Sequence, residues 1–141
     1  MATKIFVNLP VKDLSRSIEF FIRLGYTFNP QFTDENATCM IISEDIFVML
    51  LTEQFFTTFT KQPISDAKKS TEVIICLSAE SKELVDEMIR NAVDAGATTP
   101  NAKQDKGFMY GHGFQDLDGH LWEYMWMDMN AVPQQAKTET F

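Results

Sequence analysis

The sequence predicts an α+β protein that uses one plan twice: a strand, a helix and three further strands (βαβββ). The first observation is a repeated helix face, in which apolar residues at helical spacing end on a glycine and return 71 positions later. The two sets are Leu14, Ile18, Ile22 and Gly25, and Val85, Ile89, Val93 and Gly96. The second observation is that short β-rich runs flank both helical segments. Together they indicate a duplicated module.

The first module begins with a strand predicted at residues 5–9, which Pro10 is expected to end. Asp13 is a suitable N-cap for the helix that follows, and Gly25 is a suitable stop. Three strands then complete the module, predicted at 26–28, 38–42 and 46–51, with a hairpin turn at 43–45.

The second module repeats this order. A strand is predicted at 73–77, followed by a helix with Ser81 as N-cap and Gly96 as stop. The remaining strands are expected near Ala97, at 108–114 and at 121–127, with a tight turn at 116–119.

These elements give a domain organisation of one structural domain with two modules. The first module spans residues 1–53 and the second spans 71–130. A polar linker with a short helical turn is expected at 54–70, and a disordered tail at 131–141.

Charge and cysteine content narrow the partners and the compartment. The 141 residues carry a formal net charge of −8, which argues against nucleic acid and anionic membranes as partners. No run resembles a signal peptide or reaches the length of a membrane span. Cys39 and Cys76 lie in apolar strand-like segments, so both are expected to be buried free thiols in a reducing, cytoplasmic protein.

Two segments resemble the signatures of a known superfamily. Residues 11–26, VKDLSRSIEFFIRLGY, resemble the first-helix signature of the vicinal oxygen chelate superfamily. This group includes glyoxalase I, extradiol dioxygenases and bleomycin- and fosfomycin-resistance proteins. Residues 114–123, FQDLDGHLWE, resemble its second signature, an Asp-x-Asp-Gly turn before a strand that carries a ligand glutamate. The most similar subgroup is the one labelled predicted lactoylglutathione lyase. The resemblance implies tandem βαβββ modules that form an open, barrel-like cleft.

The resemblance also implies four metal-ligand positions, and most of them are occupied by residues that do not suit a metal. They fall on Phe6, on Met49 or Leu50, on Ile74 and on Glu123. Only Glu123 is an ordinary ligand, and one carboxylate with one thioether is a poor site for Mg, Mn, Ni or Zn. No cofactor is therefore expected. The alternative is a displaced divalent-metal site, built from Asn8, Glu72, His112 and Glu123.

Glu123 is the candidate catalytic residue, with a role as general base. Along its strand it alternates with the large aromatics Trp122, Tyr124 and Trp126, which are expected to pack under the helix and turn Glu123 toward the cleft. His120, next to the tight turn, is expected at the surface. The residues expected to line the ligand pocket are Phe6, Asn8, Ile74, Tyr110, His112 and Met125.

Three functions are compatible with these residues. The leading hypothesis is a family member that binds a small molecule in an apolar cleft without the usual metal. The second is a lactoylglutathione lyase-like isomerase or lyase that uses Glu123 with a displaced metal. The third is a non-catalytic homodimeric module, since exposed edge strands favour dimers.

Overall fold

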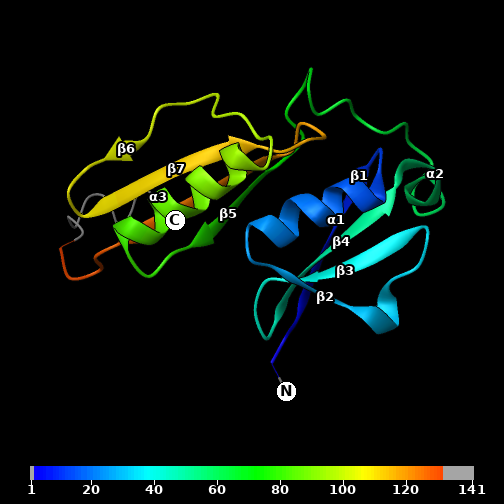
Figure 1. The fold of residues 1–141 in the computed structure, drawn as a ribbon, viewed down its shortest axis with the longest axis horizontal. Coiled ribbons are helices and arrows are strands. Elements are labelled where there is room, and N and C mark those ends of the chain that lie inside the picture. The colour runs from blue at the N-terminus through cyan, green and yellow to red at the C-terminus, as the bar shows by residue number, and fades with distance from the viewer. Residues whose placement is uncertain (1, 132–141) are drawn as a thin grey trace. The chain divides into compact units, whose positions relative to one another are not determined.

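The chain divides into two compact units, unit 1 (Met1–Ser70) and unit 2 (Thr71–Phe141). The computed structural model describes residues 2–131, so most of the predicted tail, 132–141, lies outside the described residues. Each unit contains a four-stranded sheet and one long helix (Figure 1). The boundary between the units falls at the end of the predicted linker.

Unit 1 has the predicted βαβββ order. Its sheet is ordered β1-β4-β3-β2, with β1 parallel to β4 and the other neighbours antiparallel. A short helix, α2 (Glu53–Phe56), then opens the linker. The other elements are β1 (Ile5–Val11), α1 (Leu14–Arg23), β2 (Thr27–Asn29), the 3-10 turn η1 (Pro30–Phe32), β3 (Ala37–Ile41) and β4 (Ile46–Thr52).

Unit 2 repeats this topology with the order β5-β8-β7-β6. Strand β5 is parallel to β8, and the other pairs are antiparallel. The elements are β5 (Ile74–Ser78), α3 (Lys82–Asp94), β6 (Gln104–Asp105), β7 (Met109–Gln115) and β8 (Leu121–Met127). The predicted α+β class and tandem βαβββ plan are therefore confirmed.

The predicted caps begin and end both long helices. The Asp13 carboxylate accepts a hydrogen bond from Arg16 N at 3.2 Å, and the Ser81 hydroxyl accepts one from Leu84 N at 3.0 Å. Gly25 and Gly96 follow the helices with φ of 101° and 115°, a left-handed conformation that favours glycine.

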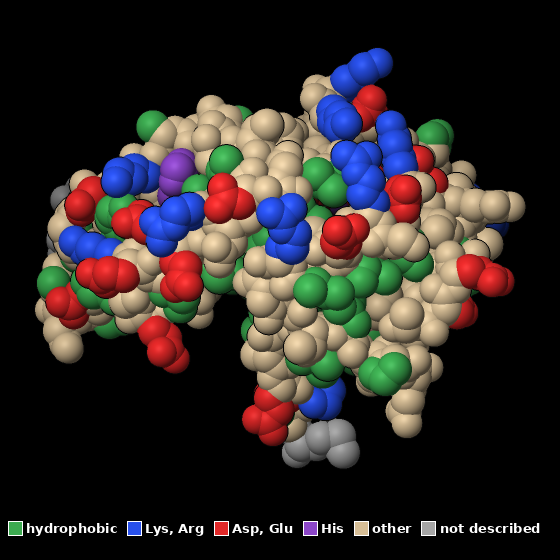
Figure 2. Space-filling view, viewed as in Figure 1, with side chains coloured by type: hydrophobic (Ala, Val, Ile, Leu, Met, Phe, Trp, Pro, Cys, Tyr) green, Lys and Arg blue, Asp and Glu red, His purple; other side chains and the backbone are tan. Residues whose placement is uncertain are grey.

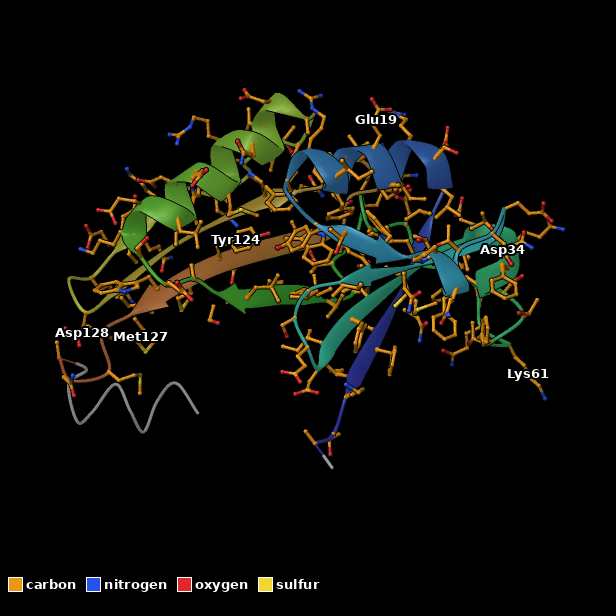
Figure 3. The ribbon with its side chains drawn as sticks, turned by 60° about the horizontal axis from the view of Figure 1, so that its bottom comes forward. Glu19, Asp34, Lys61, Tyr124, Met127 and Asp128 are labelled. Atoms are coloured by element: carbon orange, nitrogen blue, oxygen red, sulfur yellow. The ribbon has the colours of Figure 1, made fainter. Side chains whose placement is uncertain are left out.

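The buried helix faces differ in part from the predicted ones. In α1 the buried residues are Leu14, Ser17, Phe20 and Phe21, and Ile22 is 55% exposed. At 100° per residue, Ile22 lies about 80° from Leu14, outside the stripe that faces the sheet. Val93 is exposed on α3 in the same way. Glu19 points away from the sheet of unit 1 (Figure 3).

Three further expectations were wrong. Pro10 does not end β1, which continues to Val11, because β1 is an edge strand and its outer side needs no N–H. No strand forms at Ala97; instead Thr98 makes an isolated bridge to Gln115. Cys39 is buried as expected, but Cys76 is exposed.

The visible surface mixes both signs of charge, with acidic and basic side chains interspersed over the face drawn in Figure 2. Among the described residues, no helix is long and apolar enough to cross a membrane.

Candidate ligand site

Unit 2 contains a cavity of about 490 Å³. Its wall consists of residues 100–104, which precede and enter β6. Its floor comes from the middle strands β7 and β8, and Ile74 of β5 closes one side. This volume is sufficient for a drug-sized or smaller organic molecule.

The cavity exists because the segment before β6 separates from β7. Thr98 pairs with Gln115, and Gln104 pairs with Gly111. Between these two pairs, the segment before β6 has five residues, 99–103, whereas β7 has only three, 112–114. The two extra residues bow outward from β7 (Figure 1). Pro100 in this segment has no N–H and does not support a regular ladder.

Gly111 and Gly113 leave the cavity side of β7 without side chains. A Cβ at Gly113 would lie 2.6 Å from the Trp122 carbonyl oxygen and 3.1 Å from Glu123 Cγ. A Cβ at Gly111 would lie 3.5 Å from Met125 Cε. Glu123 and Met125 therefore lean from β8 across β7, over positions without side chains. A glycine within a strand often marks such a close approach, and Gly-x-Gly around His112 was the signal for it in the sequence.

Glu123 lines the cavity and is partly exposed. Trp122 and Tyr124 beside it are buried on the other face of β8, as the alternation predicted. Figure 3 labels Tyr124 on this strand. Cys76 of β5 is the register partner of Glu123. Partial desolvation, and secondarily the Glu123 carboxylate, raise the pKa of the Cys76 thiol. The cavity side of the sheet thus carries one carboxylate among apolar groups.

His112 lines the cavity at its edge and holds the wall. Its Nε2 atom lies 3.0 Å from the Asn101 carbonyl oxygen. His112 pairs with Tyr124, whereas Glu123 pairs with Gly113, so the two side chains leave the sheet on opposite faces. His112 is therefore placed to position residues 100–104.

Tyr110 does not line the cavity. Its hydroxyl donates to Asp86 of α3 at 2.5 Å, and Lys103 Nζ lies 5.7 Å from its ring centroid. The hydrogen bond to Asp86 is the main cause of the raised pKa of Tyr110. Tyr110 alternates along β7 with Gly111, which faces the cavity. The Tyr110 side chain therefore lies on the helix side of β7. It supports the cavity wall from behind, through Lys103.

The other predicted pocket residues divide between the two units. Ile74 and Met125 line the cavity. Phe6 and Asn8 are exposed on β1 of unit 1, where Phe6 stacks on Phe47 with ring centroids 4.9 Å apart. They take no part in the cavity of unit 2.

A buried polar network beneath the turn was not expected from the sequence. Asp116 accepts hydrogen bonds at 2.9 Å from the Asp118, His120 and Trp122 N–H groups, the last through Nε1. His120 is 2% exposed rather than at the surface, and its Nδ1 lies 3.0 Å from Glu72 Oε1. Burial raises the pKa of Asp116, and nearby His120 and the N–H donors oppose this rise. Because the turn consists largely of polar residues, the sequence predicted an exposed turn, whereas Asp116 and His120 are buried.

The residues around Glu123 do not fit a divalent metal. Within residues 2–131, no three His, Cys, Asp or Glu side chains come together as a metal-binding group. Three residues of the predicted displaced set do not converge within unit 2, because Glu72 pairs with His120 and His112 leaves the sheet on the face opposite Glu123. Phe6 and Ile74 have no donor atom.

Comparison with known proteins gives one family-model match and many similar structures. Residues 3–43 match the model described as bleomycin resistance protein-like N-terminal. A hypothetical protein from S. aureus is 28% identical, with a TM-score of 0.75 over 89% of this chain and 95% of that one. Comparison with curated protein sequences gives no match.

Two further structures have the same fold at lower identity. A glyoxalase/bleomycin resistance protein/dioxygenase family enzyme from Burkholderia phytofirmans is 14% identical, with a TM-score of 0.76 over 89% of this chain and 99% of that one. The fosfomycin resistance protein FosX from Mesorhizobium loti is 12% identical, with a TM-score of 0.67 over 92% and 96%.

These similarities show that the chain has the glyoxalase/bleomycin-resistance fold, which the sequence resemblance to the vicinal oxygen chelate superfamily implied. The sequence similarity to the bleomycin resistance protein-like N-terminal family lies within unit 1, at residues 3–43.

Proposed function

We propose that this chain binds a small organic molecule in the cavity of unit 2 without the metal ion typical of its superfamily. The observation that carries the proposal is the cavity itself, about 490 Å³, whose strand floor carries methionines, glycines and the Glu123 carboxylate and whose wall adds polar residues such as Asn101 and Lys103. A concave site of this volume that combines apolar side chains with a few polar groups is the usual form of a small-molecule site.

The donor chemistry supports the metal-free part of the proposal. Phe6 and Ile74 occupy two of the implied ligand positions with hydrocarbon side chains, and Met49 offers a thioether at most. Glu123 alone is retained. A hard divalent cation needs several oxygen or nitrogen donors.

A ligand screen by thermal unfolding tests the binding. We expect some compounds to raise the Tm of the protein in EDTA, and to lose this effect with Gly111→Leu. A Cβ at Gly111 meets no atom closer than 3.4 Å, so the variant should fold while its side chain fills the cavity. Glu87→Leu, at an exposed position of α3, is the matched control. Equal stabilisation of wild type and Gly111→Leu would contradict the proposed site.

Metal content tests the second part. Protein incubated with nickel, zinc, cobalt or manganese and then desalted should contain no stoichiometric metal by mass spectrometry. Bound metal that disappears in Glu123→Gln would show a working chelate site and overturn the metal-free proposal.

Glu123 in the cavity favours one alternative, a lactoylglutathione lyase-like activity in which this carboxylate moves a proton. It predicts conversion of a glutathione hemithioacetal above background, and a loss of at least about a hundredfold with Glu123→Gln, the range of general-base contributions. Background rates with all four metals would exclude it.

We also propose that the protein is a homodimer and that it is located in the cytoplasm. A monomer by light scattering would rule out the first, and cell fractionation tests the second.

A further inference from the structure

One backbone position in the cavity has hydrogen-bonding groups without a strand partner. Thr98 and Gln115 exchange two hydrogen bonds, of 3.1 and 2.7 Å. The backbone groups of Gln115 therefore point toward the segment before β6. Because these groups alternate along a strand, those of Gly113 point the same way.

Other bonds confirm this direction. The Met109 carbonyl, with the same parity, accepts from Lys106 N on the β6 side at 2.8 Å. The Phe108 carbonyl, with the opposite parity, accepts from Asp128 N, next to β8. The N–H and C=O of Gly113 thus face the interval where residues 99–103 bow away. In the part of the chain that the structure describes, no residue is bonded to either group.

An unpaired donor and acceptor in a cavity are costly unless water or a ligand satisfies them. Gly113 lines the cavity and is only partly exposed. It has no side chain, so a ligand can approach its peptide groups closely. The interval is bounded by paired residues at both ends, Thr98–Gln115 and Gln104–Gly111, which leaves room for one ligand group and not for an added strand.

We propose that the cavity selects ligands that carry an amide, with an N–H next to a carbonyl, through two hydrogen bonds to the backbone of Gly113. The ligand N–H donates to the Gly113 carbonyl, and the Gly113 N–H donates to the ligand carbonyl. This inference rests on the proposed function of the cavity and names its ligand class: lactams and other amides with an apolar body. Met109, Leu121 and Met125 provide the apolar contacts, since methionine adapts to ring-shaped groups.

Three compounds of nearly equal shape separate amide recognition from general binding. The lactam 2-quinolinone has the N–H and the carbonyl, coumarin replaces the N–H by oxygen, and N-methyl-2-quinolinone blocks it. Each is titrated into the full-length, isotope-labelled protein while backbone amide signals are followed by NMR.

We expect 2-quinolinone to shift the Gly113 amide signal more than the amide signals of α3, and to bind at least about fivefold more tightly than the other two compounds. The ratio follows from about 1 kcal/mol or more for an unsatisfied buried carbonyl. Equal affinities of all three compounds would overturn the amide proposal and leave small-molecule binding intact. Failure of 2-quinolinone to move the Gly113 signal would overturn it too, whatever the thermal screen finds.

Glu123→Met, which has neither a carboxylate nor an amide oxygen, is the control for the nearby carboxylate of Glu123, an alternative acceptor for the ligand N–H. Because the backbone of Gly113 is unchanged in this variant, the preference for 2-quinolinone over coumarin should persist. A preference that disappears would assign the N–H recognition to Glu123 and refute the role of Gly113.

Discussion

Units 1 and 2 share one topology but differ in how the edge strand, β2 or β6, pairs with its neighbour, β3 or β7. In unit 1, β2 stays in register with β3, with Thr27 opposite Ile41 and Asn29 opposite Cys39. In unit 2, the equivalent edge has two extra residues and leaves β7 between Thr98 and Gln104. The cross-strand pair Cys39–Met49 of unit 1, in which both residues have side chains, contrasts with the pair Gly113–Glu123 of unit 2. A ligand cavity therefore arises from an edge irregularity and two glycines, without any change of topology.

The largest expected difference between the units concerns their hairpin turns. Asp116→Ala should lower the free energy of unfolding by about 3 kcal/mol, since two buried N–H groups and one partly buried N–H group lose their acceptor. Asp45→Ala in the turn of unit 1 loses an exposed 3.1 Å pair with Lys4 and should cost less than about 1 kcal/mol. Urea unfolding measures both. Similar losses would show that the buried network is not the stabilising feature.

The glycine on β7 gives the next effect. Gly113→Val should destabilise the protein by about 1–3 kcal/mol, because its Cβ meets the Trp122 carbonyl at 2.6 Å. Cys39→Val, at a buried position of β3, should cost less than about 1.5 kcal/mol, as a swap between small side chains. Denaturant midpoints compare the two. A harmless Gly113→Val would show that Glu123 does not need the space above β7.

Acidity should distinguish the two units through Asp116. Its pKa is raised by folding, so the folded state holds the proton where the unfolded state, with a pKa near 3.8, has lost it. The contribution of Asp116 to stability is therefore largest at low pH, and declines as pH rises through the folded pKa, by at most about 1.4 kcal/mol per pH unit. The difference in unfolding free energy between wild type and Asp116→Asn should show this slope.

The helix caps should give the smallest contrast. Asp13→Ala in unit 1 and Ser81→Ala in unit 2 each remove one cap and should each cost about 1 kcal/mol. Thermal unfolding of the two variants checks that the duplicated helices are equivalent. A cost above about 2 kcal/mol in one of them would mean that its cap has an additional tertiary role.

Local sequence signals were sufficient wherever the determinant was local. Asp13, Ser81, Gly25 and Gly96 identified both helices, since capping and left-handed stops depend on neighbouring residues alone. The alternation along β8 predicted that Glu123 lies on the face of the strand opposite to Trp122 and Tyr124. His112 and Met125, both predicted to line a ligand pocket, lie beside the cavity of unit 2, although ligand binding there stays a prediction.

Tertiary structure decided the features that depend on distant partners. Tyr110 lies under α3, where its hydroxyl donates a hydrogen bond to Asp86. His120 is buried, with its ring beside Glu72 and its backbone N–H bonded to Asp116. Neither partner is visible in a local pattern. The cavity likewise depends on where the segment before β6 rejoins β7, a register that one sequence does not specify. The sequence by itself determined the repeated module and its helix ends, because these follow from backbone conformation and residue type. Only the folded chain decided which side chains are paired, which are buried and which peptide groups face the cavity, because these follow from contacts between strands far apart in sequence.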